Sequence, residues 1–111
     1  MTLVAFPSSA QIELPRRQLA AFCRRWKVTE LALFGSVLRE DFRPESDIDL
    51  LVSFQPRAHW SLFDLVSMQA ELCKILGREI DLVERKAVES SSNYIRRRHI
   101  LQSAQVIYAA R

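Results

Sequence analysis

Apolar and polar positions follow a helical period in some segments of the chain and the alternating period of a strand in others. The first segment is helical. Between residues 15 and 27, apolar side chains recur at the i, i+3, i+4 and i+7 spacing of one helix face, at Leu19, Phe22, Cys23 and Trp26. Pro15 suits the first turn, because a proline there loses no hydrogen bond that the helix needs. The pattern predicts an amphipathic helix over residues 15–27.

A second helix is predicted over residues 62–76, because this segment carries a signal at each end. Ser61 and Asp64 have the spacing of a capping pair, and Gly77 stands where a left-handed residue commonly ends a helix. The predicted apolar stripe consists of Leu62, Leu65, Val66, Leu72, Cys73 and Leu76. Such a stripe would pack this helix against the rest of the domain.

Four segments have strand character. Residues 30–35 form an apolar run that ends at a glycine, residues 47–54 and 79–83 alternate between apolar and polar side chains, and residues 106–108 add a short final strand. A third helix is predicted over residues 90–103, with its cap among the three serines at its start. This order of elements predicts an α/β (α+β) fold, in which helices pack on one small mixed sheet.

The composition fits one compact domain. The chain has 111 residues, 49% of them hydrophobic and 26% charged, with only two Gly, so disordered and collagenous architectures are excluded. We expect residues 1–14 to be an N-terminal extension and residues 15–111 to be a single domain. No apolar run approaches the roughly 20 residues of a membrane span, and residues 1–10 lack the pattern of a secretory signal. We therefore expect a cytoplasmic protein without membrane contact.

Charge and cysteine content narrow the possibilities further. The formal net charge of +3 is smaller than a dedicated DNA-binding domain usually carries, but charge alone does not decide the class of partner. We expect no direct nucleic-acid binding. Cys23 and Cys73 fall in apolar helical stripes and not in a metal-ligand spacing. Both are therefore interpreted as reduced core residues.

The residues that carry chemistry are a Gly-Ser pair and an Asp-Ile-Asp sequence, which ten intervening residues separate. Asp47 and Asp49 are two positions apart on a predicted strand, so both carboxylates project from one face of the sheet. Two like charges this close favour a shared hard cation such as Mg²⁺. Gly35 and Ser36 lie at a strand end, where backbone N–H groups and a hydroxyl can bind phosphate oxygens.

Asp81 is the candidate for a third carboxylate. It lies between Ile80 and Leu82 in a predicted strand, where an unpaired charge would be costly. A carboxylate on a strand next to the Asp pair would complete a two-metal site of the kind used in phosphoryl chemistry. The combination of a phosphate-binding turn and three carboxylates therefore predicts an active site.

The same residues resemble a known signature. Residues 33–36 (Leu-Phe-Gly-Ser) and 46–52 (Ser-Asp-Ile-Asp-Leu-Leu-Val) resemble the signature of the DNA polymerase β-like nucleotidyltransferase superfamily. Over residues 15–108 the chain more closely resembles the minimal nucleotidyltransferases, which are the antitoxin partners of HEPN-domain toxins. The resemblance implies a polymerase β-like core, and no residue of the active pattern is missing.

The resemblance also implies a role for each matched residue. The catalytic carboxylates and magnesium ligands would be Asp47, Asp49 and Asp81. Gly35 and Ser36 would hold the nucleoside triphosphate. Arg39 matches a frequent basic position after the Gly-Ser pair and is included among the nucleotide-binding residues.

The implied reaction is transfer of AMP from ATP to a tyrosine hydroxyl of a HEPN ribonuclease toxin, which would silence the toxin. Because the chain is short, we expect the acceptor to arrive on a separate molecule, in a homo- or hetero-oligomeric assembly. One alternative is an antitoxin that acts by contact alone, with Trp60, Phe63 and residues 96–99 as contact residues. Another is nucleotidyl transfer to a small molecule or to RNA.

Overall fold

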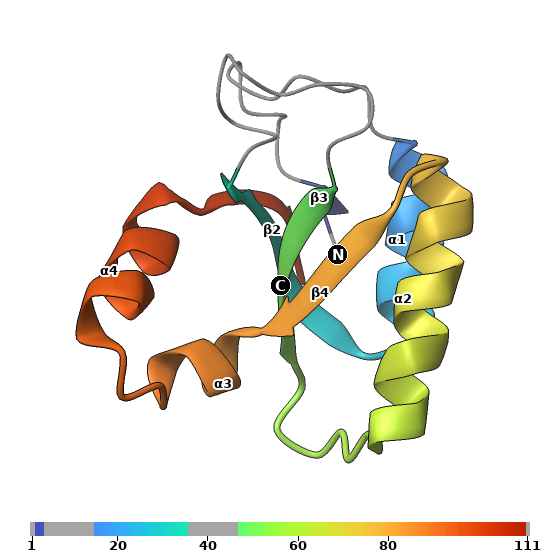
Figure 1. The fold of residues 1–111 in the computed structure, drawn as a ribbon. Coiled ribbons are helices and arrows are strands. Elements are labelled where there is room, and N and C mark those ends of the chain that lie inside the picture. Colours follow the sequence, from blue (N-terminus) through green and yellow to red (C-terminus); the bar gives the residue numbers. More distant parts are fainter. Residues whose placement is uncertain (1, 4–14, 36–46, 111) are drawn as a thin grey trace.

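The computed structural model describes residues 2–3, 15–35 and 47–110, which form a five-stranded sheet with helices on both faces (Figure 1). The strands are β1 (Thr2–Leu3), β2 (Val28–Phe34), β3 (Ile48–Phe54), β4 (Ile80–Glu84) and β5 (Gln105–Ala109). The helices are α1 (Arg16–Arg25), α2 (Leu62–Leu76), α3 (Arg85–Glu89) and α4 (Tyr94–Ser103). The predicted mixed sheet with packed helices is confirmed.

The sheet has the strand order β1-β5-β2-β3-β4. β3 and β4 run parallel, whereas the other neighbouring strands pair antiparallel. The parallel pair is possible because α2 connects the two strands as a crossover. Since β2 runs opposite to β3, the end of β2 meets the starts of β3 and β4 at one edge of the sheet.

Two apolar layers hold the helices on the sheet. The larger layer lies under α1 and α2, and its fully buried residues include Leu19, Phe22, Leu50, Met68 and Leu72. The smaller layer lies under α3 and α4 and consists of Ala32, Phe34, Leu51, Val88 and Ile100. Because successive residues of a strand point to opposite faces, β3 is apolar on both sides at its centre.

The ends of α2 are as predicted. The Ser61 hydroxyl accepts a hydrogen bond from the Asp64 backbone N–H at 3.2 Å, and the Asp64 carboxylate accepts one from the Ser61 N–H at 2.8 Å. Gly77 ends the helix in the left-handed conformation, with φ +67°. Within the described parts of the chain, no helix combines the length and apolarity needed to cross a membrane.

The predicted apolar stripe of α2 is partly wrong. Leu62 and Val66 are 77% and 62% exposed, whereas Met68, which lay outside the predicted stripe, is fully buried beside Leu72. Apolar residues occupy more than one face of this helix, so its periodicity alone does not select the inner face. The residues at positions 65, 68, 72 and 76 face the sheet, whereas Phe63 is 85% exposed.

The segment after β4 differs from the prediction of one helix over residues 90–103. It forms two helices, α3 and α4, and the cap of α4 is Asn93, whose side chain accepts from the Arg96 N–H at 3.1 Å. Asparagine caps a helix as well as serine does. The strand β1, which pairs with β5 and falls within the predicted N-terminal extension, carried no detectable pattern because it is two residues long.

Both cysteines are free thiols, as predicted, and they differ in burial. Cys23 is fully buried in α1, whereas Cys73 is half-buried at the edge of the same apolar layer. Burial raises the pKa of the Cys23 thiol from its ordinary value of 9.0 to about 12. Desolvation of the thiolate in this apolar layer is the physical cause.

This shift predicts a loss of stability at high pH. Between about pH 9 and 12 the unfolded chain has lost the Cys23 proton and the folded chain keeps it, so the free energy of unfolding falls by up to about 1.4 kcal/mol per pH unit. Urea unfolding at pH 8 and pH 10 measures the fall. Cys23→Ala should be less stable at pH 8 but should show a shallower decline with pH, and an equal slope in both proteins would contradict the assignment.

Candidate active site

Gly35 directly follows β2, in a conformation and a position that only glycine accommodates. Its φ is +75°, in the left-handed region that other residues rarely adopt. A Cβ added to Gly35 would overlap the Asp49 Oδ2 atom and would come within 3.2 Å of its Cγ. The Asp49 carboxylate therefore packs directly on the Gly35 backbone.

Asp49 and Asp81 are brought together by the pairing of two parallel strands. They are register partners on β3 and β4, and registered side chains of neighbouring strands point to the same face of the sheet. That face is the one that α3 and α4 cover further along the strands. Asp49 is half-buried, Asp81 is exposed, and the exposed Asp47 precedes β3 by one residue. All three lie at the edge where β2 ends.

Buried neighbours and hydrogen bonds fix the strands that carry these carboxylates. Ile48 and Leu50, on either side of Asp49, are fully buried on the α1 and α2 face. The Ile48 N–H donates to the Glu79 carbonyl at 2.9 Å, which ties the starts of β3 and β4 together. The Leu82 N–H donates to Gln69 Oε1 at 3.2 Å, so the edge strand β4 is also attached to α2. Asp49 and Asp81 are thus held on a rigid frame.

The arrangement suits a divalent cation. Registered Cα atoms of neighbouring strands are about 4.8 Å apart, so the Asp49 and Asp81 carboxylates can share an oxygen-preferring ion. Within residues 15–35 and 47–110, however, no three His, Cys, Asp or Glu side chains converge as a ready-made metal site. The three-carboxylate set therefore stays a prediction. Ser36 and Arg39 lie outside the described residues.

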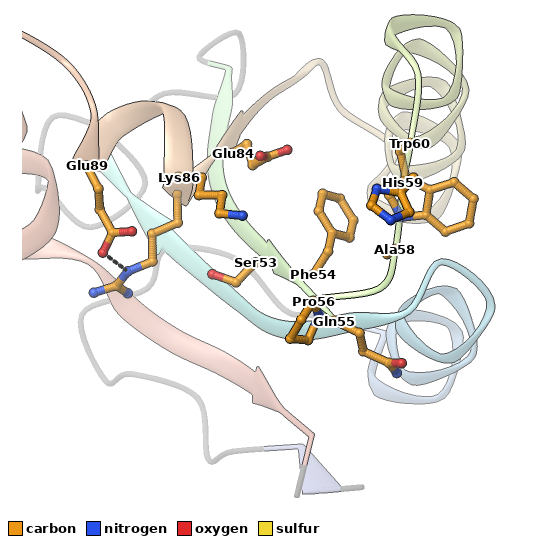
Figure 2. A pocket seen from close by; sticks show the side chains of 11 residues that line it. Ser53, Phe54, Gln55, Pro56, Ala58, His59, Trp60, Glu84, Lys86 and Glu89 are labelled. Atoms are coloured by element: carbon orange, nitrogen blue, oxygen red, sulfur yellow. Dashed lines mark hydrogen bonds and ion pairs between the residues drawn. The ribbon is translucent and has the colours of Figure 1, made fainter.

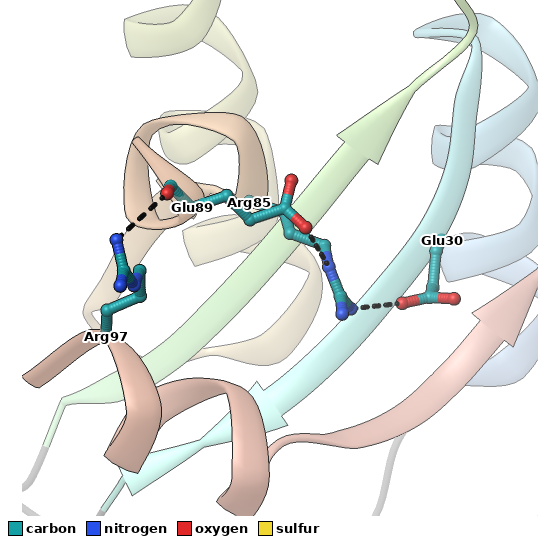
Figure 3. Close-up of polar contacts among 4 residues, drawn as sticks. All are labelled: Glu30, Arg85, Glu89 and Arg97. Carbon is teal, nitrogen blue, oxygen red and sulfur yellow. Dashed lines mark hydrogen bonds and ion pairs between the residues drawn. The ribbon is translucent and has the colours of Figure 1, made fainter. Parts of the chain in front are cut away.

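A cluster of charged residues on the same face of the sheet holds α3 in place. No local sequence pattern indicates this cluster. Arg85 donates from Nη1 to Glu30 Oε1 at 3.0 Å and forms a longer contact, of 3.5 Å, with Glu89 Oε2 (Figure 3). Arg97 donates to the Glu89 carbonyl oxygen at 3.5 Å and links α4 to α3. Glu30 and Arg85 are 55 residues apart, so only the folded sheet reveals the pair.

The chain matches a known protein family over most of its length. A model of the nucleotidyltransferase domain matches residues 15–106. This range contains Gly35, Ser36 and the three aspartates of the candidate site. The match therefore covers the whole constellation that the sequence predicted.

Similar proteins of known name or structure agree with this match. A chain of Methanocaldococcus jannaschii, provisionally named a protein adenylyltransferase, is 33% identical over 78 residues, which are 70% of this chain and 78% of that one. A solved structure provisionally described as a minimal nucleotidyltransferase is 29% identical, with a TM-score of 0.61 over 81% of this chain and 88% of that one. A crystal structure of a toxin-antitoxin with AMP-PNP shares the fold, with a TM-score of 0.66 at 19% identity over 88% of this chain and 76% of that one.

Proposed function

The chain belongs to the nucleotidyltransferase domain family, and from that premise we propose that it transfers AMP from ATP to a tyrosine hydroxyl of a HEPN-type toxin and thereby silences it. The enzyme class, a nucleotidyltransferase, follows from the family itself. The nucleotide, the acceptor and the biological role are the proposal.

The observation that carries the proposal is the contact between the Gly35 backbone and the Asp49 carboxylate, beside Asp81 in register. A glycine that lies against a carboxylate lets phosphate groups approach the backbone within reach of the same carboxylate. Phosphoryl transfer needs such a meeting of a phosphate-binding turn and acidic residues, because its catalysis consists largely of positioning and charge stabilisation.

The chemistry of the donor set suits magnesium. Asp49 and Asp81 are adjacent in register and Asp47 lies at the same edge, and carboxylate oxygens are the ligands that Mg²⁺ prefers. We infer that these three residues hold the metal. When bound, Mg²⁺ supplies positive charge that offsets the negative charge of the phosphoryl oxygens.

In the proposed reaction each residue has a defined task. Gly35 and Ser36 bind the triphosphate through backbone N–H groups and the hydroxyl, and Arg39 adds a positive charge. Asp81 takes the proton of the acceptor hydroxyl, whose oxygen attacks the α-phosphorus of ATP. A bond forms between that oxygen and phosphorus, the bond to the β-phosphate oxygen breaks, and pyrophosphate leaves.

Similar proteins support the choice of donor and acceptor. The Methanocaldococcus relative bears the name of a protein adenylyltransferase, and the toxin-antitoxin structure of the same fold contains AMP-PNP, an analogue of ATP. Both fit a reaction in which the acceptor belongs to a second protein. The resemblance to minimal nucleotidyltransferases adds the tyrosine acceptor and the HEPN class of partner.

Replacing Asp81 with asparagine tests the assigned proton transfer. Because Asp81 is exposed on an edge strand, Asp81→Asn should fold normally. It should lower the turnover number by about a hundredfold to ten-thousandfold, as expected for loss of a general base. The apparent affinity for ATP should change much less. The measurement is transfer of α-labelled phosphate from ATP to the partner toxin across a range of ATP concentrations.

A matched control is Glu79→Gln, which removes an exposed carboxylate two residues before Asp81 on the same edge. It should transfer AMP at the normal rate. If Asp81→Asn instead lost ATP affinity and reached normal turnover at saturating ATP, Asp81 would be a binding residue and the assigned role would be wrong.

A further inference from the structure

A pocket lies at the opposite end of the strands from the aspartates. It occupies about 410 Å³ between the ends of β3 and β4, the loop over residues 55–60 and α3 (Figure 2). The residues that give it chemical character are Ser53, Phe54, His59, Trp60, Glu84 and Lys86. This volume falls in the range of small-molecule sites. Asp49 and Asp81 are the second residues of the strands that Phe54 and Glu84 end, so the pocket is separate from the candidate active site.

The topology makes this end of the strands a natural binding position. After β3 the chain continues into α2 on one face of the sheet, and after β4 it continues into α3 on the other face (Figure 1). When the connections of two neighbouring parallel strands leave to opposite faces, a crevice opens beyond their carboxyl ends, and α/β proteins bind ligands in such crevices. The pocket lies in that crevice.

Contacts within the protein hold two of the residues that line the pocket, Trp60 and Arg85. The Trp60 ring packs edge-on against Trp26 and Phe54, with ring centroids 5.1 and 6.5 Å away, and its Nε1 donates to the Trp26 carbonyl at 3.0 Å. On the opposite side, Arg85 is held by Glu30 and Glu89 and anchors α3 (Figure 3). A preformed pocket requires little ordering when it binds a ligand.

The charged residues of this pocket differ in whether they are already paired. Arg85 and Glu89 are engaged with each other, but within the described parts of the chain Lys86 and Glu84 form no ion pair or side-chain hydrogen bond. Figure 2 shows both side chains extending toward the Phe54 ring. The pocket therefore presents one positive group, one negative group and an aromatic surface, so its two available charges sum to zero.

We propose that this pocket binds a free α-amino acid with an apolar side chain. Lys86 receives the carboxylate, Glu84 receives the ammonium group, and the side chain packs on Phe54. A zwitterion matches this pair of groups because it satisfies both charges at once. A simple anion bound to Lys86 would place its negative charge beside Glu84. A simple cation bound to Glu84 would place its positive charge beside Lys86.

The test uses the full chain and three probes: L-phenylalanine, L-phenylalaninamide, which lacks the carboxylate, and N-acetyl-L-phenylalanine, which lacks the ammonium group. Binding is followed by NMR through the Trp60 indole N–H and the Ser53 amide. L-phenylalanine should saturate these shifts at millimolar concentrations or below, and each analogue should bind at least about tenfold more weakly.

Two substitutions assign the groups. Lys86→Met should bind L-phenylalanine and its amide equally, and Glu84→Gln should bind L-phenylalanine and its N-acetyl derivative equally. Lys74→Met, which removes an exposed lysine of α2 outside the pocket, should behave as the unmodified protein. Thermal unfolding of each variant verifies that it is folded.

Three results would overturn the proposal. The first is the absence of saturable shifts at Trp60 and Ser53 with L-phenylalanine in the folded, unmodified protein. The second is equal binding of L-phenylalanine and either analogue to that protein. The third is a preference for L-phenylalanine over one of the analogues that persists in both the Lys86→Met and the Glu84→Gln protein. None of these results depends on AMP transfer, so they leave the proposed function unaffected.

Discussion

Replacing Asp49 with asparagine is expected to lower AMP transfer by at least about a thousandfold, which corresponds to about 4 kcal/mol of transition-state stabilisation. Asp49 is the half-buried carboxylate between Gly35 and Asp81, so it is central to the proposed metal and phosphate site. Asparagine has nearly the same shape, and it removes a negative charge beside Asp81. The free energy of unfolding should therefore change by less than about 1 kcal/mol. Label transfer from ATP and urea unfolding measure the two quantities.

The control for Asp49→Asn is Asp64→Asn, the same chemical change in the capping box of α2. The Asp64 carboxylate accepts from the Ser61 N–H at 2.8 Å, so its loss should destabilise the fold by about 1 kcal/mol. Transfer should remain near normal, because this residue lies far from the aspartate edge along the chain and the sheet. Normal AMP transfer by the Asp49→Asn protein would show that Asp49 does not belong to the site.

Gly35→Ala is expected to abolish detectable transfer and also to destabilise the protein. The left-handed φ of +75° strains any side chain, and the new Cβ would overlap the Asp49 carboxylate. The backbone strain alone costs on the order of 1–3 kcal/mol. The overlap displaces Asp49 or the Gly35 backbone, so the proposed phosphate-binding backbone and the carboxylate lose their alignment. Urea unfolding and label transfer from ATP together measure the effect.

Gly77→Ala separates the two causes. Gly77 has a similar φ of +67°, but a Cβ there has no neighbour within 4 Å. It should cost about 1 kcal/mol of stability through the C-cap of α2 and leave transfer intact. If Gly35→Ala lost no more stability and activity than Gly77→Ala, the close packing of Gly35 on Asp49 would have no functional importance.

Local signals predicted most of the architecture. The capping pair Ser61 and Asp64 and the left-handed Gly77 mark α2 correctly, because these interactions join residues close in the chain. The alternation over β3 placed Ile48 and Leu50 on the opposite face from Asp49, as the two buried layers confirm. The order of helices and strands then limited the fold to a mixed sheet with helices packed on it.

The features that local patterns failed to predict depend on contacts between residues far apart in the chain. The inner face of α2 is selected by the sheet that it covers, so Leu62 and Val66 are exposed although they fit the helical stripe. The short helix α3 is held by the pair of Arg85 with Glu30 on β2, which no periodicity reveals. The same holds for the site: the sequence predicted Gly35 and Asp49 as site residues, but their direct packing follows from the pairing of β2 with β3.

The central claim is that this protein silences its partner by catalysed AMP transfer, and the stoichiometry of neutralisation tests it most directly. A small amount of the protein with ATP and Mg²⁺ should inactivate a molar excess of the toxin. Mass spectrometry should then show AMP-sized increments on a tyrosine peptide of the toxin. A contact inhibitor acts through buried surface, so it would need equimolar protein and would work without ATP. Neutralisation at one-to-one stoichiometry by the Asp47→Asn protein, with no change in toxin mass, would contradict the account.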